Sequence, residues 1–357
     1  MKKLFVFIAC IVCMITTSCG NKSEQDIEKE ISTGVVLVQN QSYYEVELSN
    51  GEKLYFSSYD ENEGIKGIAT DEDSVSVVTS YGTGFFISND GQIVTNAHVV
   101  SNTVADKDVT KSVSKIVDAL KKITLAMYNE YTEKYEEAVQ AYNYANYSDE
   151  ISYEDFYKIR DIKDALDEKR SEYAQTYNGL NEINASESEI KYHNKISIAY
   201  NDTYVTSTTD FVSCVLTKID PDHDLAILQL KDKKTPEGKY IFEVADEDPL
   251  ETYSWKENIT KKISEDKNSK LFMTSFNLGP TLALTKEGIK SQFNSGTVSQ
   301  RTNERLMYSI PALPGSSGSP VVNLQGQLVA INYAGLNETQ NFNYGIRVKY
   351  LKSLIDK

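Results

Sequence analysis

Histidine, cysteine, proline and basic residues are all scarce in this 357-residue sequence. It has three histidines, four cysteines and seven prolines, and 52 acidic side chains outnumber its 37 basic ones. The formal net charge of -15 repels a phosphate backbone at long range, which argues against nucleic-acid binding. The low proline content and 40% hydrophobic residues are typical of a folded globular protein, and four cysteines are too few for a disulfide scaffold of this length.

Cys214 is the only cysteine outside the first twenty residues. It lies in an apolar run and has no cysteine or group of metal-ligating residues near it in the sequence. We therefore interpret it as a buried core thiol and expect neither a disulfide nor a metal site. We also expect no cofactor.

The start of the chain has the pattern of an export signal. Two lysines precede an apolar run over residues 4–15, which is too short to span a bilayer but has the length of a signal-peptide core. The following TTSCG, at residues 16–20, resembles the lipobox of bacterial lipoproteins, with Thr16 where most lipoboxes have leucine. This resemblance implies a diacylglyceryl group on Cys19 that anchors an exported protein to a bacterial membrane, on the periplasmic or cell-surface side. The alternative is an ordinary cleaved signal with an incidental cysteine.

Short strands are predicted on both sides of one long helical region. The N-terminal strand predictions cover residues 34–38, 43–48, 53–56, 75–78, 82–88 and 93–95, with a type I′ hairpin turn at Asn50-Gly51 and another turn at residues 89–91. Strand patterns return at Ile196 and continue to the end of the chain. The chain is therefore predicted to be mainly β, with one helical insertion.

The insertion has the apolar periodicity of two helices. One stripe runs from Val109 to Tyr142 through Leu120 and Ile123, and a second runs from Phe156 to Leu180 after a break at residues 143–151. Ser152 with Asp155 is typical of an N-cap. We expect an antiparallel coiled-coil hairpin of two helices, each about 45 to 50 Å long at 1.5 Å per residue, that buries both stripes in its seam.

Tyrosine is concentrated in this insertion. Eleven of the 24 tyrosines lie between residues 104 and 193. Either they fill the seam between the helices, or the hairpin is a partner-docking arm, a self-association element or a lid, because tyrosine is favoured at protein interfaces.

Three segments carry the residues that acyl transfer needs. His98 lies in TNAHVV at residues 95–100, Asp224 in DPDHDLAIL at 220–228, and Ser317 in PGSSGSP at 314–320. A serine hydroxyl needs an imidazole to take its proton, and the imidazole needs a carboxylate to fix its tautomer. Gly315 allows the backbone to turn so that its N–H and that of Ser317 can bind the oxyanion of a tetrahedral intermediate.

The other candidates in these segments are weaker. Asp220 and Asp222 compete with Asp224, but only Asp224 directly precedes the apolar strand. His193 and His223 are interpreted as surface residues.

In the order His, Asp, Ser, these motifs resemble the trypsin-like serine proteases. GTGF at residues 82–85, DLAIL at 224–228 and the run at 314–320 are most similar to the bacterial HtrA (Deg) branch, and the resemblance covers about 75–103 and 194–357. It implies a trypsin-like double β-barrel with its site between the barrels. In that site Ser317 is the nucleophile, His98 the general acid and base, Asp224 the orienting carboxylate, and Gly315 with Ser317 the oxyanion hole.

The resemblance also implies how substrate binds. The strand Asn332, Tyr333, Ala334 and Gly335 would be the edge to which a substrate adds as a β-strand. Residues 309–314 precede the nucleophile and would line the pocket for the substrate side chain before the scissile bond. They contain no acid, so we expect that pocket to prefer an apolar or small side chain.

The sequence departs from the family in three respects. Ser319 replaces the second glycine of the usual run, and the helical insertion separates His98 from Asp224. The last barrel strand lies close to the end of the sequence, so we expect no PDZ domain.

These patterns predict six segments and one principal function. The segments are a signal peptide (1–18), a tether (19–33), N-terminal strands with the start of the first barrel (34–103), the helical hairpin (104–193), the rest of the first barrel (194–245) and the second barrel (246–357). The expected function is an exported, lipid-anchored serine endopeptidase that hydrolyses polypeptide substrates through an acyl-enzyme. The alternative is a catalytically idle protease-like scaffold, or a chaperone-like binder, that presents the hairpin to a protein partner or to a second copy.

Overall fold

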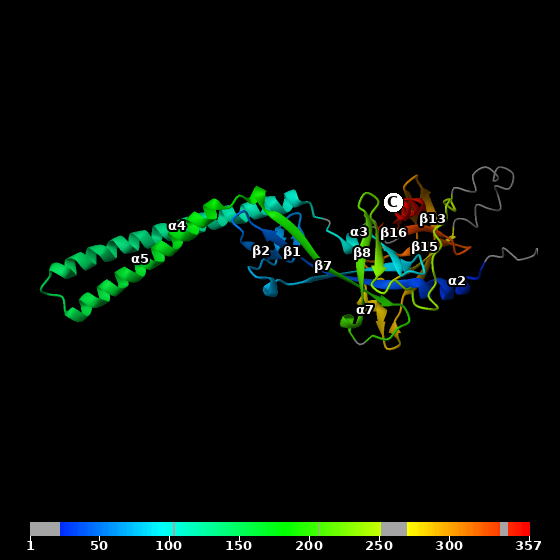
Figure 1. Ribbon diagram of the computed structural model, residues 1–357, viewed down its shortest axis with the longest axis horizontal. Coiled ribbons are helices and arrows are strands. Elements are labelled where there is room, and N and C mark those ends of the chain that lie inside the picture. Colours follow the sequence, from blue (N-terminus) through cyan, green and yellow to red (C-terminus); the bar gives the residue numbers. More distant parts are fainter. Residues whose placement is uncertain (1–21, 103, 206, 251–269, 336–341) are drawn as a thin grey trace, which may run out of the picture. The chain divides into compact units, whose positions relative to one another are not determined.

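The computed structural model describes residues 22–102, 104–205, 207–250, 270–335 and 342–357 (Figure 1). The chain divides into two compact units. The first unit contains residues up to 41 together with 79–101 and 195–357, and the second contains residues 42–78 and 102–194. The long strands β1 (Val35–Glu47) and β7 (Glu189–Tyr200) contribute residues to both units.

Six strands close into a first barrel. Their order is β1-β5-β6-β9-β8-β7, and a pairing between β7 and β1 closes the ring, while β2 (Lys53–Phe56) extends the sheet beyond β1. The other strands of the ring are β5 (Val78–Phe86), β6 (Gln92–Thr95), β8 (Val212–Asp220) and β9 (Leu225–Leu230). Ile93 on β6 lies opposite Leu228 on β9, and both are fully buried in the barrel core.

A second closed barrel follows in the sequence. Its order is β10-β13-β14-β17-β16-β15. The strands are β10 (Lys270–Ser275), β13 (Gln292–Arg301), β14 (Arg305–Tyr308), β15 (Pro320–Asn323), β16 (Leu328–Gly335) and β17 (Asn343–Arg347). The C-terminal helix α8 (Val348–Asp356) buries Val348, Leu351 and Leu354 in a core cluster that also holds residues of both barrels. The predicted trypsin-like double barrel is therefore confirmed.

Shorter elements join these strands. They are the helices α3 (Ala97–Val100) and α7 (Pro280–Ala283), the two-stranded sheet of β11 (Leu284–Thr285) with β12 (Gly288–Ile289), and the 3₁₀ turns η1 (Ser32–Gly34), η2 (Glu72–Ser74), η3 (Ala185–Glu187) and η4 (Thr208–Asp210).

Cys214 lies in the core of the first barrel, as predicted. It is a free, buried cysteine among the apolar side chains of β7, β8 and β9. Burial raises the pKa of this thiol to about 12, so it is protonated and inert at neutral pH.

The predicted tether is shorter than expected. Residues Glu24–Ile31 form the helix α2, which Ser23 caps by accepting a hydrogen bond from the N–H of Asp26. Ile27 and Ile31 lie one turn apart and are both fully buried in the core of the first unit. We predicted a tether because most residues of this stretch are polar. Since Ile27 and Ile31 are buried, helix α2 belongs to the folded body.

The second unit has a separate core. It combines the strand pair β1–β2, the small sheet of β3 (Ser58–Asp60) with β4 (Gly64–Lys66), and the helices α4 (Asp106–Tyr147) and α5 (Tyr153–Glu182). Its fully or nearly fully buried side chains are Tyr44, Val46, Leu48, Phe56, Val109, Val113 and Val117. The first turns of α4 therefore pack on strands rather than on α5.

The two predicted helices are confirmed, with corrections to their length and packing. Helix α4 continues through the expected break at Asn143 to Tyr147, since no proline or glycine interrupts it. Its 42 residues extend to roughly 63 Å at 1.5 Å per residue. Ser152 caps α5 by accepting from the N–H of Asp155, as predicted. Leu120 and Ile123, which we expected in the seam, are 44% and 61% exposed.

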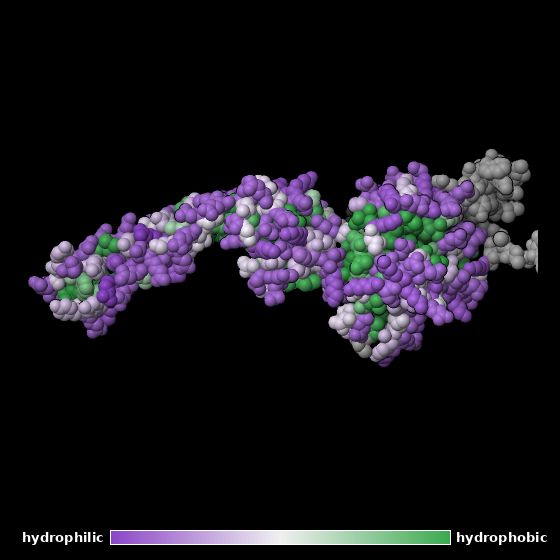
Figure 2. All heavy atoms as spheres, in the orientation of Figure 1, coloured by the Kyte–Doolittle hydropathy of each residue, from purple (hydrophilic) through white to green (hydrophobic). Residues whose placement is uncertain are grey.

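Aromatic and cationic side chains fill much of the seam between α4 and α5. Tyr131 stacks on Tyr173, and Arg170 lies over the ring of Tyr135. All residues of α5 remain at least partly exposed, and Figure 2 shows hydrophilic residues over most of this hairpin. The seam is therefore half-buried, which is typical of a two-helix hairpin with no third layer.

The turn predicted at Asn50-Gly51 has a different geometry. A type I′ turn needs positive φ at both central residues, but only Gly51 has it, with φ of 84°. The N–H of Gly51 donates to the carbonyl of Leu48, and Leu48 in turn donates to Glu52. This is a three-residue hairpin loop, with glycine where the left-handed conformation is needed.

The predicted signal and lipid site lie outside the described residues. These are residues 1–18 and Cys19. None of the helices in the described part of the chain combines the length and the apolar composition needed to cross a membrane.

Glu45 is a buried acid that stabilises the second unit. Its side chain is 7% exposed, and its two oxygens lie 2.7 Å from Lys53 Nζ and 2.9 Å from His193 Nε2. The hydrogen bond from Lys53 lowers the pKa of Glu45 below its ordinary value of 4.5, and burial, which acts in the opposite direction, does not outweigh it. The ionised form is therefore the one the fold prefers.

We predict that the second unit loses stability as the pH falls below about 4.5, because a carboxyl whose pKa is lowered by folding stabilises the fold only while it is ionised. Hydrogen-exchange protection of β2, corrected for intrinsic rates and followed from about pH 6 to pH 3, measures this loss. Glu45→Gln should show less dependence on pH, whereas Glu52→Gln, at an exposed position, should behave like wild type. Equal pH dependence in all three proteins would contradict the prediction.

Candidate active site

His98 and Asp224 lie together in the first unit. His98 is on α3, directly after β6, and its Nδ1 is 2.7 Å from Asp224 Oδ2. The backbone N–H of His98 donates to the other carboxylate oxygen at 2.9 Å. One carboxylate thus holds both the ring and the main chain of His98, which fixes the direction in which the imidazole points.

The main chain of Asp224 is held in a strained conformation by the same segment. Its φ is 52°, which is uncommon for a residue other than glycine. The carbonyl of Asp224 accepts from the N–H of Ala97 at 3.2 Å and from the Asn96 side-chain amide at 2.8 Å. Sequence reasoning missed Asn96, although its position two residues before His98 was the available signal.

His223 lies at the surface, with 30% of its side chain exposed, and it also supports the turn that carries Asp224. Its Nδ1 lies 2.9 Å from Asp220 Oδ2, and its ring stacks on Tyr350 of α8 with centroids 4.0 Å apart. Burial acts to raise the pKa of Asp220, but the hydrogen bonds from His223 lower it below its ordinary value. Asp220 therefore faces His223, while Asp224 faces His98.

The loop that carries Ser317 lies against β5, the strand before β6. The carbonyl of Ser317 accepts from the N–H of Thr83 on β5 at 2.8 Å. A Cβ added to Gly82 would lie within 3.1 Å of both Val99, the neighbour of His98, and the carbonyl oxygen of Ser317. Among the described residues, no hydrogen bond joins Ser317 Oγ to His98, although the two segments lie close together.

The two predicted oxyanion donors have no acceptor in the described part of the chain. No hydrogen bond runs from the N–H of Gly315 or from that of Ser317. Gly315 has φ of 97°, and a Cβ there would lie 2.4 Å from the carbonyl oxygen of Phe276. These two N–H groups therefore have no protein acceptor among the described residues.

Ser319, the departure from the family pattern, fits the loop. It is fully buried, and its hydroxyl donates to the carbonyl of Ser316 at 2.7 Å. The side chain therefore closes the turn that carries Ser317 and does not crowd the main chain.

Asn332 is a structural residue, contrary to its prediction as part of the substrate edge. It is buried, and its side-chain amide donates to the Ser316 carbonyl at 3.0 Å while its Oδ1 accepts from Tyr308. Its backbone N–H and carbonyl bond to Ser319 and Gly318. These contacts leave none of its main-chain polar groups for a substrate strand.

The other three residues of the predicted edge continue β16. The pairing of β15 with β16 ends at Ile331, whereas β17 pairs with Ala334 and Gly335 on the opposite side, with a bulge at Tyr333. Within the described residues, the side of β16 that faced β15 is thus unpaired from Tyr333 onward. This is the geometry that strand addition requires.

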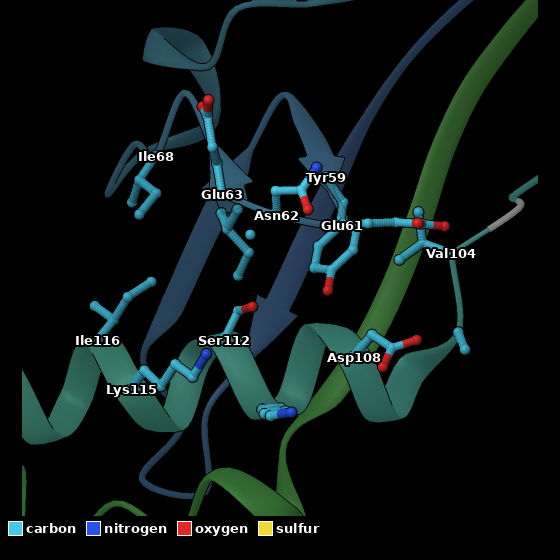
Figure 3. Close-up of a pocket in the computed structure, with 14 residues that line it drawn as sticks. Tyr59, Glu61, Asn62, Glu63, Ile68, Val104, Asp108, Ser112, Lys115 and Ile116 are labelled. Atoms are coloured by element: carbon cyan, nitrogen blue, oxygen red, sulfur yellow. The ribbon is translucent and has the colours of Figure 1, made fainter.

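A cavity of about 720 Å³ lies in the second unit, between the β3–β4 hairpin and the first turns of α4 (Figure 3). Glu61, Asn62 and Glu63 of the hairpin and Asp108 and Lys115 of α4 are among its lining residues. No histidine or cysteine is among its lining residues.

We predict that Gly318→Ala is much more destabilising than Gly238→Ala. Both glycines have φ near 80 to 90°, but a Cβ at Gly318 would lie 2.2 Å from the Thr83 carbonyl, whereas nothing lies within 4 Å of one at Gly238. Gly238→Ala should lower the free energy of unfolding by about 1 to 2 kcal/mol, the cost of the left-handed conformation alone. Denaturant titration measures the difference, and equal losses would show that the Ser317 loop is not packed as described.

Comparison with known proteins supports a peptidase. The model of the trypsin-like peptidase domain family matches residues 184–331, which include Asp224 and Ser317 but not His98. No curated protein sequence matches the chain.

Two solved structures align with most of the chain at low identity. The serine endoprotease from Yersinia pestis has a TM-score of 0.43 at 11% identity, over 94% of this chain and 66% of its own. The Rv3671c protease from M. tuberculosis, in its active form, has a TM-score of 0.42 at 11% identity, over 93% of this chain and 83% of its own. The chain thus spans slightly less than two thirds of the length of the Yersinia protein. Over residues 184–331 the chain is similar to the trypsin-like peptidase domain family, and its two six-stranded barrels form a trypsin-like fold with a long helical insertion.

Proposed function

We propose that the protein is an exported, lipid-anchored serine endopeptidase. The observation that carries this proposal is the contact of Asp224 with both the ring and the backbone of His98, next to a Ser317 loop with two unused N–H donors. With Nδ1–H donated to Asp224, the lone pair of the imidazole is on Nε2. His98 can then act as a base towards the nucleophile.

The proposed reaction follows from these positions. Ser317 Oγ attacks the substrate carbonyl carbon while His98 Nε2 takes its proton, and the carbonyl oxygen becomes an oxyanion bound by the N–H groups of Gly315 and Ser317. His98 then protonates the leaving amine, and the C–N bond breaks to form an acyl-enzyme. Water, deprotonated by His98, hydrolyses the ester and restores Ser317.

The proposed substrate is an extended polypeptide. It would add as a strand beside Tyr333, Ala334 and Gly335, where the edge of β16 is free of β15. No acid lies in the segment 309–314 before the nucleophile, so an apolar or small side chain is the expected preference.

A catalytically idle scaffold that presents the helical hairpin to a partner is the second candidate, and the exposed tyrosines at the end of the hairpin are compatible with it. Tyr147 and Tyr153, on either side of the turn between α4 and α5, are 87% and 86% exposed. Exposed tyrosines are typical of sites where a protein partner binds, or where a second copy does. A partner bound there is compatible with either candidate.

We predict that Ser317→Ala and His98→Ala each lower kcat for cleavage of an unfolded protein substrate by about ten-thousandfold, and that the double variant loses little more, because members of a triad act as a unit. The assay uses the full-length protein in detergent. His193→Ala, at a histidine of the second unit, is the matched control and should retain activity. Undiminished cleavage by Ser317→Ala would refute the proposed nucleophile, and an inactive wild-type protein would favour the scaffold.

We predict that Cys19 carries the membrane anchor. Metabolic labelling with a palmitate analogue should mark the wild-type protein but not Cys19→Ser, which should leave the membrane fraction because the acyl chains supply the binding energy. Cys214→Ser should remain labelled. Membrane retention of an unlabelled Cys19→Ser protein would instead indicate an uncleaved signal segment.

A further inference from the structure

Thr83 lies at the centre of the contacts between the first barrel and the Ser317 loop. It is on β5 and fully buried. Its N–H donates to the carbonyl of Ser317 and its hydroxyl donates to the carbonyl of Gly315, both at 2.8 Å. One residue of the first barrel therefore holds the loop of the second barrel at two points, on either side of Ser316.

The remaining polar groups of Thr83 are also used. Its hydroxyl oxygen accepts from the N–H of Phe276 at 3.0 Å, and its carbonyl accepts from the hydroxyl of Thr95 at 2.8 Å. The hydroxyl is thus both donor and acceptor in one buried chain, from the Phe276 N–H through Thr83 to the Gly315 carbonyl. Hydrogen bonds that form such a chain in a low-dielectric interior strengthen one another.

These contacts determine which groups of the Gly315 turn remain free. The carbonyl of Pro314 accepts from the N–H of Leu278 at 2.6 Å, and the carbonyl of Gly315 is held by Thr83. The N–H of Ser316 donates back to Leu313 across the turn. The carbonyls of Pro314 and Gly315 are thus both hydrogen-bonded, so the peptide groups on either side of Gly315 cannot rotate without breaking a buried hydrogen bond. The N–H of Gly315 therefore keeps its direction.

We propose that Thr83 is a positioning residue that holds the oxyanion donors of Gly315 and Ser317 in place before substrate binds. The inference rests on the proposed function, and it adds that the site is preassembled in the isolated protein. Thr83 touches no reacting atom. Its effect passes through the two carbonyls it holds, so it should act on the transition state, where the oxyanion exists, rather than on binding of the ground state.

The test compares two substitutions that differ in the hydroxyl. Thr83→Val preserves the shape and removes the hydroxyl, so that the Gly315 carbonyl and the Phe276 N–H lose their partner, whereas Thr83→Ser keeps the hydroxyl and loses a methyl group. We expect Thr83→Val to lower kcat about 100-fold with little change in KM, because misplacement of catalytic groups by about 1 Å costs that much. Thr83→Ser should retain kcat within about threefold.

A peptide aldehyde separates positioning from a general structural role. Its hemiacetal with Ser317 places an oxyanion against the Gly315 and Ser317 donors, so its inhibition constant should rise with the loss of kcat/KM in Thr83→Val, as expected for a transition-state analogue. Circular dichroism should show that the variant is folded. If Thr83→Val does not fold, Thr83→Cys takes its place, because a thiol is a weak donor and should give an intermediate loss.

The outcomes distinguish this inference from the proposed function. An active wild-type protein with an equally active Thr83→Val would overturn the role of Thr83 and leave the triad intact. A fall in kcat with an unchanged aldehyde inhibition constant would also overturn it. An inactive wild-type protein would overturn the proposed function itself.

Discussion

The site depends on one junction, where the backbone of β5 meets the loop that carries Ser317. His98 and Asp224 come from the first barrel and Ser317 comes from the second, so no local segment can align them. The hydrogen bonds from Thr83 to Gly315 and Ser317 supply that alignment. They lie in a fully buried position, where a lost partner costs more than at the surface.

Close backbone packing at this junction explains the glycines around it. A Cβ on Gly82 would lie 2.7 Å from Val99 and 3.1 Å from the Ser317 carbonyl oxygen of the opposite barrel, and a Cβ on Gly318 would lie 2.2 Å from the Thr83 carbonyl oxygen of the opposite barrel. The glycines of GTGF and PGSSGSP are thus needed for the packing of the two barrels as well as for the chemistry of the site. Ser319 is tolerated because its hydroxyl finds the Ser316 carbonyl inside the same turn.

Much of the fold and of the site could be predicted because the relevant patterns are local. The apolar periodicity predicted both helices, and Ser152 as an N-cap predicted the start of α5. Three short motifs located His98, Asp224 and Ser317.

What could not be predicted depends on contacts between distant segments. The burial of Ile27 in α2 depends on an entire core. The contact of the buried Glu45 with His193 joins residues 148 positions apart, and the support of Ser316 by Asn332 joins residues 16 positions apart. Leu120 and Ile123 are exposed because periodicity predicts a face but not whether a neighbour covers it.

Identification of the residue that reacts with a fluorophosphonate tests the central claim most directly. The full-length protein would be treated with the probe, digested and analysed by peptide mass spectrometry. Our account predicts one modified residue, Ser317, with modification that is lost in His98→Ala because the hydroxyl then has no base. Modification of another residue, or equal modification of Ser317 in the His98→Ala protein, would contradict an activated nucleophile at this site.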